Sequence, residues 1–334
     1  MGNLRAGLIG LGMMGRHHAR NLRAVDGVDL VAVADAAGDP HGLADGLPVL
    51  ASVDELIAQG LDYVVVAAPT MFHEEIGLAL ADAGVHALIE KPLAKTTEGA
   101  RALARAFADK GLVGAVGHIE RYNPALQSLR KRLEAGELGD IYQICTRRQG
   151  PFPARIADVG VIKDLASHDV DLTAWVTQRD YELVAARTMF KAGREYEDMV
   201  SATCQLSGGL MSNHLVNWLT PAKERLTIVT GEKGMFVADT LTADLTFHAN
   251  GTVVTTWDDI AQFRGVSEGD VTRFAIAKPE PLRIEHQNFR DAVLGRPADI
   301  VTLAQGARVV EVCEAMIESA ATNRFVAIDT SGLG

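Results

Sequence analysis

A glycine-rich loop near the start of the chain constrains the fold more than any other feature. It reads GLGMMG over residues 10–15, follows the short apolar run RAGLIG at 5–10, and leads into a helical pattern at 13–25. A G-x-G-x-x-G sequence between a strand and a helix, with an acidic residue about twenty positions later, is typical of dinucleotide-binding βαβ units. Asp35 stands at that position. We therefore expect the chain to begin with a Rossmann domain.

Each glycine of this loop has a physical role in such a site. Gly10 permits the tight turn, Gly12 lets the backbone approach a pyrophosphate, and Gly15 lets the helix pack closely on the strand. The positive end of the helix dipole then stabilises the phosphate charge. The expected cofactor contacts in the loop are Gly10, Gly12, Met13, Met14 and Gly15.

Asp35 indicates which dinucleotide binds. Its carboxylate would accept hydrogen bonds from the adenosine ribose hydroxyls and repel a 2′-phosphate unless a cation compensated. The next residues, Ala36 and Ala37, carry no charge. This favours NAD over NADP. The alternative is a purely structural glycine turn, with Asp35 capping a strand end.

The first third of the chain alternates strand and helix patterns. Strand-like runs occur at 5–10, 29–35, 62–69 and 86–90, and helical spacing occurs at 13–25, 52–60, 71–84 and 96–111. Strands that alternate with helices indicate βαβ units and a parallel sheet. The expected fold class is therefore α/β, with a doubly wound N-terminal domain at residues 1–120.

The remaining residues, 121–334, show a different rhythm. A helical pattern at 123–135 is followed by longer alternating runs at 140–148, 198–206, 224–239 and 241–257, the last containing the hairpin signal Asn250-Gly251. Helical patterns at 281–295 and 303–321 close the chain, and we expect them to pack back on its body. These patterns predict a second, α+β domain with one large, mostly antiparallel sheet.

Composition limits the partners and the compartment. A net charge of −11 disfavours nucleic acid and anionic membrane surfaces, both of which require a basic footprint. The three cysteines, Cys145, Cys204 and Cys313, fit neither a disulfide framework nor a zinc-finger spacing. No stretch is apolar enough for a membrane span. We expect a cytoplasmic protein that binds a small molecule.

The segment DLASHDVDL at 164–172 places three carboxylates and one imidazole in nine residues. If 163–176 is helical, Asp164, His168 and Asp171 share one face, while Asp169 points elsewhere. Oxidation of a secondary alcohol requires removal of the hydroxyl proton, and an imidazole titrates near the working pH, so His168 is the candidate general base. The alternatives are a solvated acidic face and a metal site. The spacing supplies too few ligands for a metal, and we expect none.

Three segments, GLIGLGMMGRHHAR, VVVAAPTMFHEEIGLALADAGVHALIEKPLA and DLASHDVDL, together resemble the Gfo/Idh/MocA oxidoreductase family. The resemblance implies an N-terminal Rossmann domain that binds the dinucleotide. It also implies an α+β domain whose open sheet face lies against a partner, and hence a homodimer or homotetramer.

The same resemblance assigns catalytic residues. The family motif falls on Glu90-Lys91-Pro92, which implies that Lys91 lies beside nicotinamide and substrate, where an ammonium can hydrogen-bond the substrate hydroxyl. It also implies that Asp164 acts with His168. The further cofactor contacts expected are Pro69, Glu90 and Lys91. The alternatives are a solvated Lys91 and a Glu90 that pairs with a neighbour or binds ribose.

The blocks at 117–126 and 147–172 resemble the branch of that family that oxidises UDP-N-acetylglucosamine at C3, although ADVGVIKD stands where many relatives carry a Gly-Gly pair. A diphosphate requires cations, and arginine suits bidentate phosphate contact. The candidate substrate contacts are Arg121, Tyr122, Asn123, Arg147, Arg148, Arg155 and Lys163. Alternatively, each arginine forms an ion pair, and Asn123 caps a helix that begins at Pro124.

These observations lead to one functional expectation and two alternatives. We expect an NAD-dependent sugar dehydrogenase acting on a CH-OH group, with C3 of a UDP-N-acetylhexosamine as the candidate position. The first alternative is an inositol or other sugar dehydrogenase, or a keto-sugar reductase. The second is a non-catalytic dinucleotide-sensing regulator, which would not need Lys91, Asp164 and His168, all of which are present.

Overall fold

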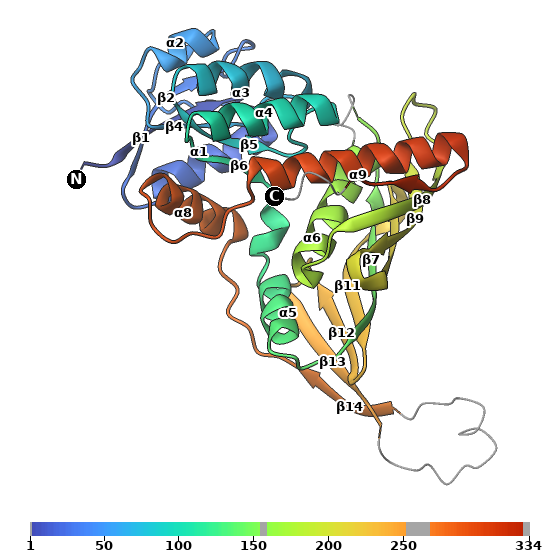
Figure 1. Cartoon of the computed structure of the whole chain (residues 1–334). Coiled ribbons are helices and arrows are strands. Elements are labelled where there is room, and N and C mark those ends of the chain that lie inside the picture. Colours follow the sequence, from blue (N-terminus) through green and yellow to red (C-terminus); the bar gives the residue numbers. More distant parts are fainter. Residues whose placement is uncertain (1, 154–158, 252–267, 330–334) are drawn as a thin grey trace, which may run out of the picture. The chain divides into compact units, whose positions relative to one another are not determined.

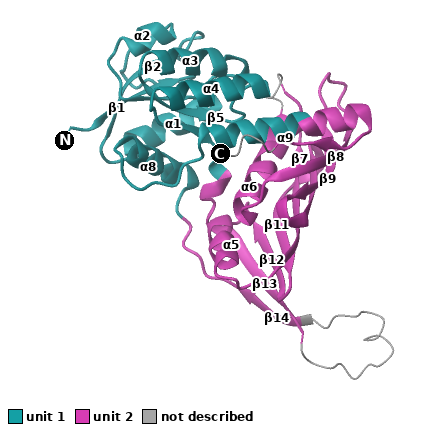
Figure 2. Cartoon of the chain, in the orientation of Figure 1, with its two compact units in different colours: residues 1–119, 279–314 teal, residues 120–278, 315–334 magenta. Residues whose placement is uncertain are grey.

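The computed structural model describes residues 2–153, 159–251 and 268–329. The chain forms two compact units (Figure 2). Unit 1 comprises residues 1–119 and 279–314, and unit 2 comprises residues 120–278 and 315–334. The first segment of unit 1 ends at residue 119, and the predicted division follows residue 120. Assigning all of 121–334 to a second domain is wrong for 279–314, because this segment folds with the Rossmann unit, where Phe289 stacks edge-on against Tyr63.

Unit 1 contains a six-stranded parallel sheet, which confirms the predicted α/β fold. The strand order is β3-β2-β1-β4-β5-β6. The strands are β1 (Leu4–Ile9), β2 (Val28–Ala34), β3 (Val49–Leu50), β4 (Tyr63–Val66), β5 (His86–Glu90) and β6 (Gly114–Gly117). Every residue of β4 is buried, as expected for a central strand that is covered on both faces.

Helices cover this sheet on both faces (Figure 1). They are α1 (Met13–Ala24), α2 (Val53–Ile57), α3 (His73–Asp82), α4 (Thr97–Asp109), α8 (Pro281–Val293) and the first part of α9 (Leu303–Thr322), with a 3-10 turn η1 (Thr70–Phe72). One apolar cluster includes Leu80 and Leu103 beside the inward side chains of β4 and β5. A separate cluster includes Leu22 and Phe289.

Unit 2 contains a nine-stranded sheet of order β14-β13-β12-β11-β7-β10-β9-β8-β15. Its pairings are antiparallel except between β7 and β10, which confirms the predicted mostly antiparallel sheet. The strands are β7 (Ile141–Pro151), β8 (Tyr181–Met189), β9 (Met199–Leu206), β10 (Leu210–Asn217), β11 (Leu219–Gly231), β12 (Gly234–Asp239), β13 (Asp244–Asn250), β14 (Glu268–Arg273) and β15 (Val326–Ala327). The strand expected at 252–257 lies outside the described residues, and β13 pairs with β12 and β14.

Two helices lie along this sheet (Figure 1). They are α5 (Pro124–Glu134) and α6 (Ser167–Thr177), and a π-helical turn, η3 (Ile162–Ala166), leads into α6. Their apolar side chains, including Leu129 and Leu172, form one core with Val229 and Phe236 of the sheet. Asn123 caps α5, since its Oδ1 accepts a hydrogen bond from the Ala125 N–H at 3.0 Å.

Candidate active site

The glycine loop of unit 1 has the geometry that its sequence predicts. Gly10 has a φ of 92°, and a methyl group there would lie 2.6 Å from the Ala67 carbonyl carbon. A methyl group at Gly15 would overlap the Gly10 carbonyl oxygen, whereas one at Gly12 would meet no protein atom within 4 Å. Gly10 and Gly15 are therefore required by the fold, while Gly12 keeps a space open next to the backbone.

The start of α1 suits an anion. Gly12 is the N-cap residue and supplies no side-chain hydrogen bond to the first turn. The first N–H groups of a helix lack intrahelical partners and carry the positive end of the dipole. Met13, the first residue of α1, is exposed. The residues present thus fit the pyrophosphate of a dinucleotide.

Asp35 is fixed at the carboxyl end of β2. Its Oδ2 accepts a hydrogen bond from the Leu11 N–H at 2.7 Å, and its Oδ1 accepts one from the Ala37 N–H at 2.8 Å. The carboxylate is therefore tied to the glycine loop and held in one orientation. Each oxygen keeps further acceptor capacity for a ribose hydroxyl.

The end of β5 carries Glu90, which points into the interior of unit 1. Its Oε1 lies 2.8 Å from His18 Nε2, and its Oε2 accepts a hydrogen bond from the Lys91 N–H at 3.1 Å. Burial raises the pKa of this carboxyl, but His18 and Lys91 together hold the pKa below its usual value. Of the roles weighed for Glu90, pairing with a neighbour is the one that the structure shows.

A second histidine extends this pair. His286 of α8 places its Nε2 3.0 Å from His18 Nδ1, and both rings are buried. The neighbouring Glu285 is also buried, and within the described residues neither of its carboxylate oxygens has a hydrogen-bond partner. Burial and the Glu90 charge raise the pKa of Glu285 well above its usual value.

His18, Glu285 and His286 were not among the predicted site residues, although the sequence contains a signal for the latter two. In α8, Leu282, Glu285, His286 and Phe289 are the buried residues, and their spacing places them on one helix face. Polar residues within an otherwise apolar stripe indicate a buried polar contact.

His73 lies on the other side of the segment that follows β5. It is the first residue of α3 and is almost fully buried. Its Nδ1 lies 2.9 Å from the Pro92 carbonyl oxygen, and its Nε2 lies 2.8 Å from the Ala68 carbonyl oxygen. The Lys91–Pro92 peptide bond is cis. His73 therefore connects the loop after β4, which includes Pro69, to the residue after Lys91.

In unit 2, Asp164 lies within η3 and His168 lies in the first turn of α6. Asp164 is buried and His168 is half-buried. The predicted helix at 163–176 is present, but its first turn is π-helical, a feature frequent at functional sites. Nine of the eleven residues of α6 are buried, so a solvated acidic face is excluded.

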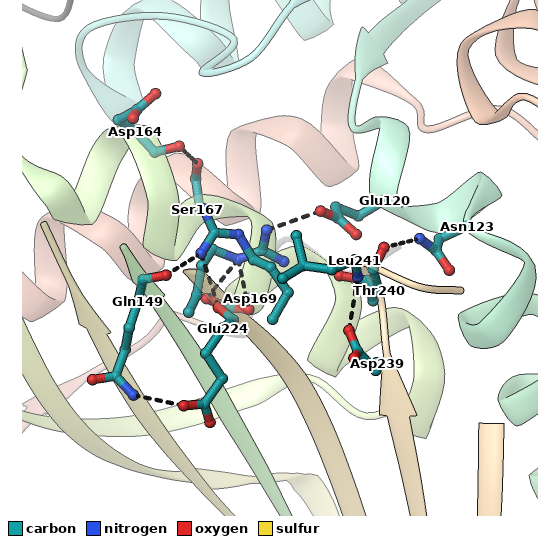
Figure 3. A network of polar contacts seen from close by, with 12 residues as sticks. Glu120, Asn123, Gln149, Asp164, Ser167, Asp169, Glu224, Asp239, Thr240 and Leu241 are labelled. Carbon is teal, nitrogen blue, oxygen red and sulfur yellow. Dashed lines mark hydrogen bonds and ion pairs between the residues drawn. The ribbon is translucent and has the colours of Figure 1, made fainter. Parts of the chain in front are cut away.

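The other two carboxylates of this segment form buried ion pairs. Asp171 pairs with Arg121, and Asp169 accepts two hydrogen bonds of 3.1 Å from Arg148 Nε. Glu120 also pairs with Arg148 at 2.8 Å (Figure 3). Burial raises the pKa of Asp169 to about 6, although Arg148 opposes this effect.

These pairs change the interpretation of the candidate substrate contacts. Arg121 and Arg148 are bound to internal carboxylates, as the ion-pair alternative predicts. Asn123 caps α5 and donates a hydrogen bond to the Thr240 carbonyl at 3.0 Å (Figure 3), and Tyr122 is buried. We therefore no longer assign Arg121 and Arg148 to the substrate.

The remaining candidates are more accessible or lie outside the described residues. Arg147 is about half exposed and pairs with Glu224 at 3.0 Å. Lys163 is half-buried in η3. Arg155 falls in the segment 154–158, outside the described residues.

Sequence reasoning missed one further cation. Arg225 stands directly across from Arg148 in the pairing of β11 with β7. Its Nη1 donates to the carbonyl oxygens of Gln149 at 2.7 Å and Glu224 at 2.9 Å, and no salt bridge to a described residue is formed. Burial and the Arg148 charge lower the pKa of Arg225. Arg225 lies near Arg147 and Arg148 because of the register in which β11 pairs with β7, which the sequence alone does not show.

The described part of the chain contains neither a metal-binding cluster nor a helix that could span a membrane. Within residues 2–153, 159–251 and 268–329, no group of three or more His, Cys, Asp or Glu side chains is arranged to hold a metal ion. In the same ranges, no helix combines the length and the apolar character needed to cross a bilayer.

Family models match both parts of the chain. The model of an oxidoreductase family with an NAD-binding Rossmann fold, Gfo/Idh/MocA, matches residues 4–118, and the model of the Gfo/Idh/MocA C-terminal domain matches residues 126–237. These ranges include the glycine loop, the Glu90-Lys91-Pro92 segment and the η3–α6 region.

Individual relatives cover different substrates. The chain is 37% identical over 215 residues to the UDP-N-acetylglucosamine 3-dehydrogenase of Acidithiobacillus ferrooxidans, covering 63% of this chain and 66% of that protein. It is 31% identical over 183 residues to the scyllo-inositol 2-dehydrogenase (NAD(+)) of Bacillus subtilis, covering 52% and 54%. In these sequence alignments the chain thus spans about half to two thirds of the length of the curated relatives.

The fold comparison extends over the whole chain. The crystal structure of the UDP-N-acetylglucosamine 3-dehydrogenase GnnA from Acidithiobacillus ferrooxidans superposes with a TM-score of 0.82 at 28% identity, covering 96% of this chain and 99% of that chain. The parallel sheet with its glycine loop and the second, mostly antiparallel sheet therefore form an architecture that is also found in a sugar-nucleotide dehydrogenase.

Proposed function

Because the chain belongs to the Gfo/Idh/MocA oxidoreductase family, whose N-terminal domain has an NAD-binding Rossmann fold, we propose that it is an NAD-dependent dehydrogenase. Its substrate is a sugar with a secondary hydroxyl, and the candidate position is C3 of a UDP-N-acetylhexosamine. The observation that carries the cofactor part of this proposal is the open space at Gly12 beside an uncapped helix start, with Asp35 fixed next to it.

In this proposal the residues of unit 1 hold the cofactor. The N–H groups at the start of α1, approached across Gly12 and flanked by Met13 and Met14, bind the pyrophosphate, and Asp35 binds the adenosine ribose. Pro69 contributes from the loop after β4, and the backbone of that loop touches Gly10 at Ala67. When bound, NAD supplies the hydride acceptor for the oxidation.

Lys91 acts on the substrate oxygen. Its ammonium donates a hydrogen bond to the hydroxyl that is oxidised and stabilises the negative charge that develops as the proton leaves. Glu90, whose carboxylate faces His18, supports this lysine from the interior rather than by touching substrate. The buried position of Glu90 and the hydrogen bond to the Lys91 N–H support this division of roles.

His168 removes the hydroxyl proton in this proposal. Asp164, one turn earlier, either orients the imidazole and stabilises its charged form or takes the proton itself. Asp169 and Asp171 have structural roles, since each is bound to a buried arginine. His168 or Asp164 thus takes up the hydroxyl proton, while the carbon that is oxidised gives up a hydride.

A nucleotide-sugar substrate is supported by the relative at 37% identity, and an inositol substrate by the relative at 31% identity. The diphosphate of a nucleotide-sugar would require cations. Arg147, Lys163 and Arg155 are the candidates kept from the sequence, and Arg225 joins them because, among the described residues, its hydrogen bonds go to the backbone carbonyls of Gln149 and Glu224.

A substrate panel tests the proposal directly. The full chain is incubated with NAD and, separately, with UDP-N-acetylglucosamine, UDP-N-acetylgalactosamine, UDP-glucose, myo-inositol or scyllo-inositol, and reduced nicotinamide is followed by absorbance. We expect turnover with a UDP-N-acetylhexosamine and a product that has lost two hydrogens by mass spectrometry. Turnover only with an inositol would overturn the substrate assignment. Binding of NAD without turnover of any sugar, or of any keto-sugar with NADH, would favour the regulator.

Variants test the catalytic assignment. We expect Lys91→Met and His168→Ala to lower kcat by about 10²–10⁴-fold, the usual contribution of a positioned proton-transfer or charge-stabilising group. The matched controls are Lys110→Met, at the end of α4, and His41→Ala, both exposed, and we expect them to keep wild-type activity. Near-normal turnover of either catalytic variant would contradict its assignment.

We also propose that the enzyme is a cytoplasmic homodimer or homotetramer. Support comes from the sheet of unit 2, where Met211 of β10 and Tyr142 of β7 are exposed apolar side chains. Light scattering coupled to gel filtration measures the mass in solution, and a monomer at micromolar concentration would contradict the proposal.

A further inference from the structure

Two buried histidines hold the segment Glu90-Lys91-Pro92 from both ends. His18 of α1 contacts the Glu90 carboxylate at 2.8 Å, on the residue before Lys91. His73 of α3 contacts the Pro92 carbonyl oxygen at 2.9 Å, on the residue after Lys91. Both imidazoles are almost fully buried. All of these contacts lie within unit 1.

The first contact depends on a chain of three side chains. Glu90 Oε1 accepts from His18 Nε2, so the His18 ring carries its hydrogen on Nε2. His18 Nδ1 lies 3.0 Å from His286 Nε2, which can donate a hydrogen bond to it. Removing His18 would leave a buried carboxylate with the Lys91 N–H as its one remaining hydrogen-bond partner among the described residues, a costly arrangement. His18 therefore fixes where the Glu90 side chain, and the backbone after it, can lie.

The second contact connects two loops. Both ring nitrogens of His73 face carbonyl oxygens, Pro92 on one side and Ala68 on the other. A neutral imidazole can donate to one of these acceptors, and an imidazolium can donate to both. Burial lowers the pKa of His73, while the two carbonyls and Glu90 oppose that effect. When Nδ1 carries a hydrogen, as in the imidazolium and in one of the two neutral tautomers, the ring holds the carbonyl that follows Lys91 against the loop after β4.

The surroundings leave the segment little room to adjust. On the β6 side, a methyl group at Gly117 would lie 3.1 Å from the Glu90 carboxyl carbon. On the α8 side, His286 packs edge-on against His18, and the buried Glu285 lies close enough to Glu90 for the Glu90 charge to raise its pKa. The titratable groups around the segment are thus His18, His73, Glu285 and His286, with Glu90 and Lys91 themselves.

We infer that His18 and His73 are positioning residues for Lys91, His18 through the Glu90 carboxylate and His73 through the Pro92 carbonyl. They raise turnover without touching substrate. This inference rests on the proposed role of Lys91 as the group that hydrogen-bonds the substrate hydroxyl. Displacement of a catalytic group by about 1 Å can cost on the order of 100-fold in rate, which sets the size of the expected effect.

Paired variants separate hydrogen bonding from mere packing. His18→Gln keeps a donor near the place of Nε2, and His73→Asn keeps one near the place of Nδ1, whereas leucine at either position fills space without a donor. We expect His18→Leu and His73→Leu to lower kcat by about 10–100-fold. We expect the NAD dissociation constant and the substrate KM to change by less than about threefold, because neither residue contacts ligand. The amide variants should recover kcat to within about threefold of wild type.

A matched control and a double-mutant cycle complete the test. His86→Leu, at the opposite end of β5, should keep wild-type kcat. In a Lys91→Met background, adding His18→Leu or His73→Leu should cost less than about threefold, since no ammonium remains to be positioned. If the Met variant turns over too slowly to measure, the kcat values and NAD affinities of the leucine and amide variants decide the question.

Three results would overturn the inference. These are wild-type kcat in both leucine variants, a loss of NAD affinity that matches the loss of kcat, or full additivity with Lys91→Met. Should His73→Leu fail to fold, the His18 pair and His73→Asn decide the question. Full activity of Lys91→Met would instead refute the proposed function. An inactive Lys91→Met together with fully active leucine variants would refute this inference alone.

Discussion

Arg121 and Asp171 form a two-point ion pair in the interior of unit 2, with Nη2–Oδ1 at 2.6 Å and Nε–Oδ2 at 2.9 Å. The Arg121 side chain is 7% exposed and that of Asp171 is 1% exposed. The guanidinium and the carboxylate therefore neutralise each other away from water. We infer from this geometry that Arg121 stabilises the fold of unit 2.

We predict that Arg121→Met and Asp171→Leu each lower the free energy of unfolding by about 3–5 kcal/mol, because each removes the oppositely charged partner of a buried ionic group. The double variant should lose less than either single variant, since it removes both charges of the pair together. All three tryptophans lie in residues 120–278, so tryptophan fluorescence during urea unfolding reports on unit 2.

The matched control is Lys110→Met, which breaks an ion pair with Asp82 on the surface of unit 1. It should cost less than about 1 kcal/mol, as exposed pairs usually do, measured by circular dichroism. Single Arg121 or Asp171 variants that unfold at the wild-type urea concentration would contradict the structural role of the pair.

The glycine loop predicts opposite behaviour at two neighbouring positions. Gly15→Ala should unfold at a clearly lower temperature, because its methyl group would overlap the Gly10 carbonyl oxygen. Gly12→Ala should keep the wild-type melting temperature, since a methyl group there meets no protein atom within 4 Å. It should nevertheless bind NAD at least tenfold more weakly, because the methyl group occupies the path of the pyrophosphate.

Differential scanning fluorimetry, with and without NAD, distinguishes the two glycine variants in one experiment. The Gly12 variant should lose the thermal shift that NAD gives the wild-type protein. An unchanged shift in that variant would show that the dinucleotide does not pass across Gly12.

Asp35 should set both the affinity for NAD and the choice of dinucleotide. We predict that Asp35→Ala weakens NAD binding by about 10–100-fold, the size expected when hydrogen bonds to a charged group are lost. The same variant should narrow the gap between NAD and NADP, because the carboxylate no longer repels a 2′-phosphate. Isothermal titration with both dinucleotides measures the two effects. Asp39→Ala, in the loop that follows Asp35, is the matched control and should leave both affinities unchanged.

Glu285 should make the stability of unit 1 depend on pH. Its folded-state pKa is raised well above the ordinary value, so the folded protein holds a proton that the unfolded chain releases. Stability contributed by this proton is present below the unfolded-state pKa and is lost as the pH rises towards the folded-state pKa. The loss has a slope of up to about 1.4 kcal/mol per pH unit.

Glu285→Gln removes this proton equilibrium while keeping the shape of the side chain. Relative to wild type, the variant should therefore gain stability between pH 5 and pH 8, measured by calorimetric melting at both values. Equal melting differences at the two pH values would show that Glu285 does not hold a proton in the folded state.

Local patterns predicted most of the architecture. The alternation of strand and helix in the first third, and the glycines at positions 10, 12 and 15, depend on neighbours in sequence, so the spacing of residues contains the information. The same holds for Asn123, which caps α5 one residue before Pro124.

Contacts between residues far apart in the sequence could not be predicted from local patterns. Glu90 is paired with His18, 72 positions away, and His18 in turn with His286, 268 positions away. The partners of Arg148 could not be predicted either. The pairing with Asp169 depends on how α6 packs against β7 and not on the spacing of residues in the sequence. For the same reason, residues 279–314 were assigned to the wrong domain.

The division of the chain between its two units also determines the order in which the protein can be assembled on the ribosome. The strands β1 to β6 are synthesised before unit 2, yet the helix that brings His286 to His18 and Phe289 to Tyr63 is synthesised only after the whole stretch 120–278. A nascent chain arrested before residue 281 would expose the apolar face that Phe289 later covers. The contact between His18 and His286 behind Lys91 can therefore form only after residues 120–278 have been synthesised.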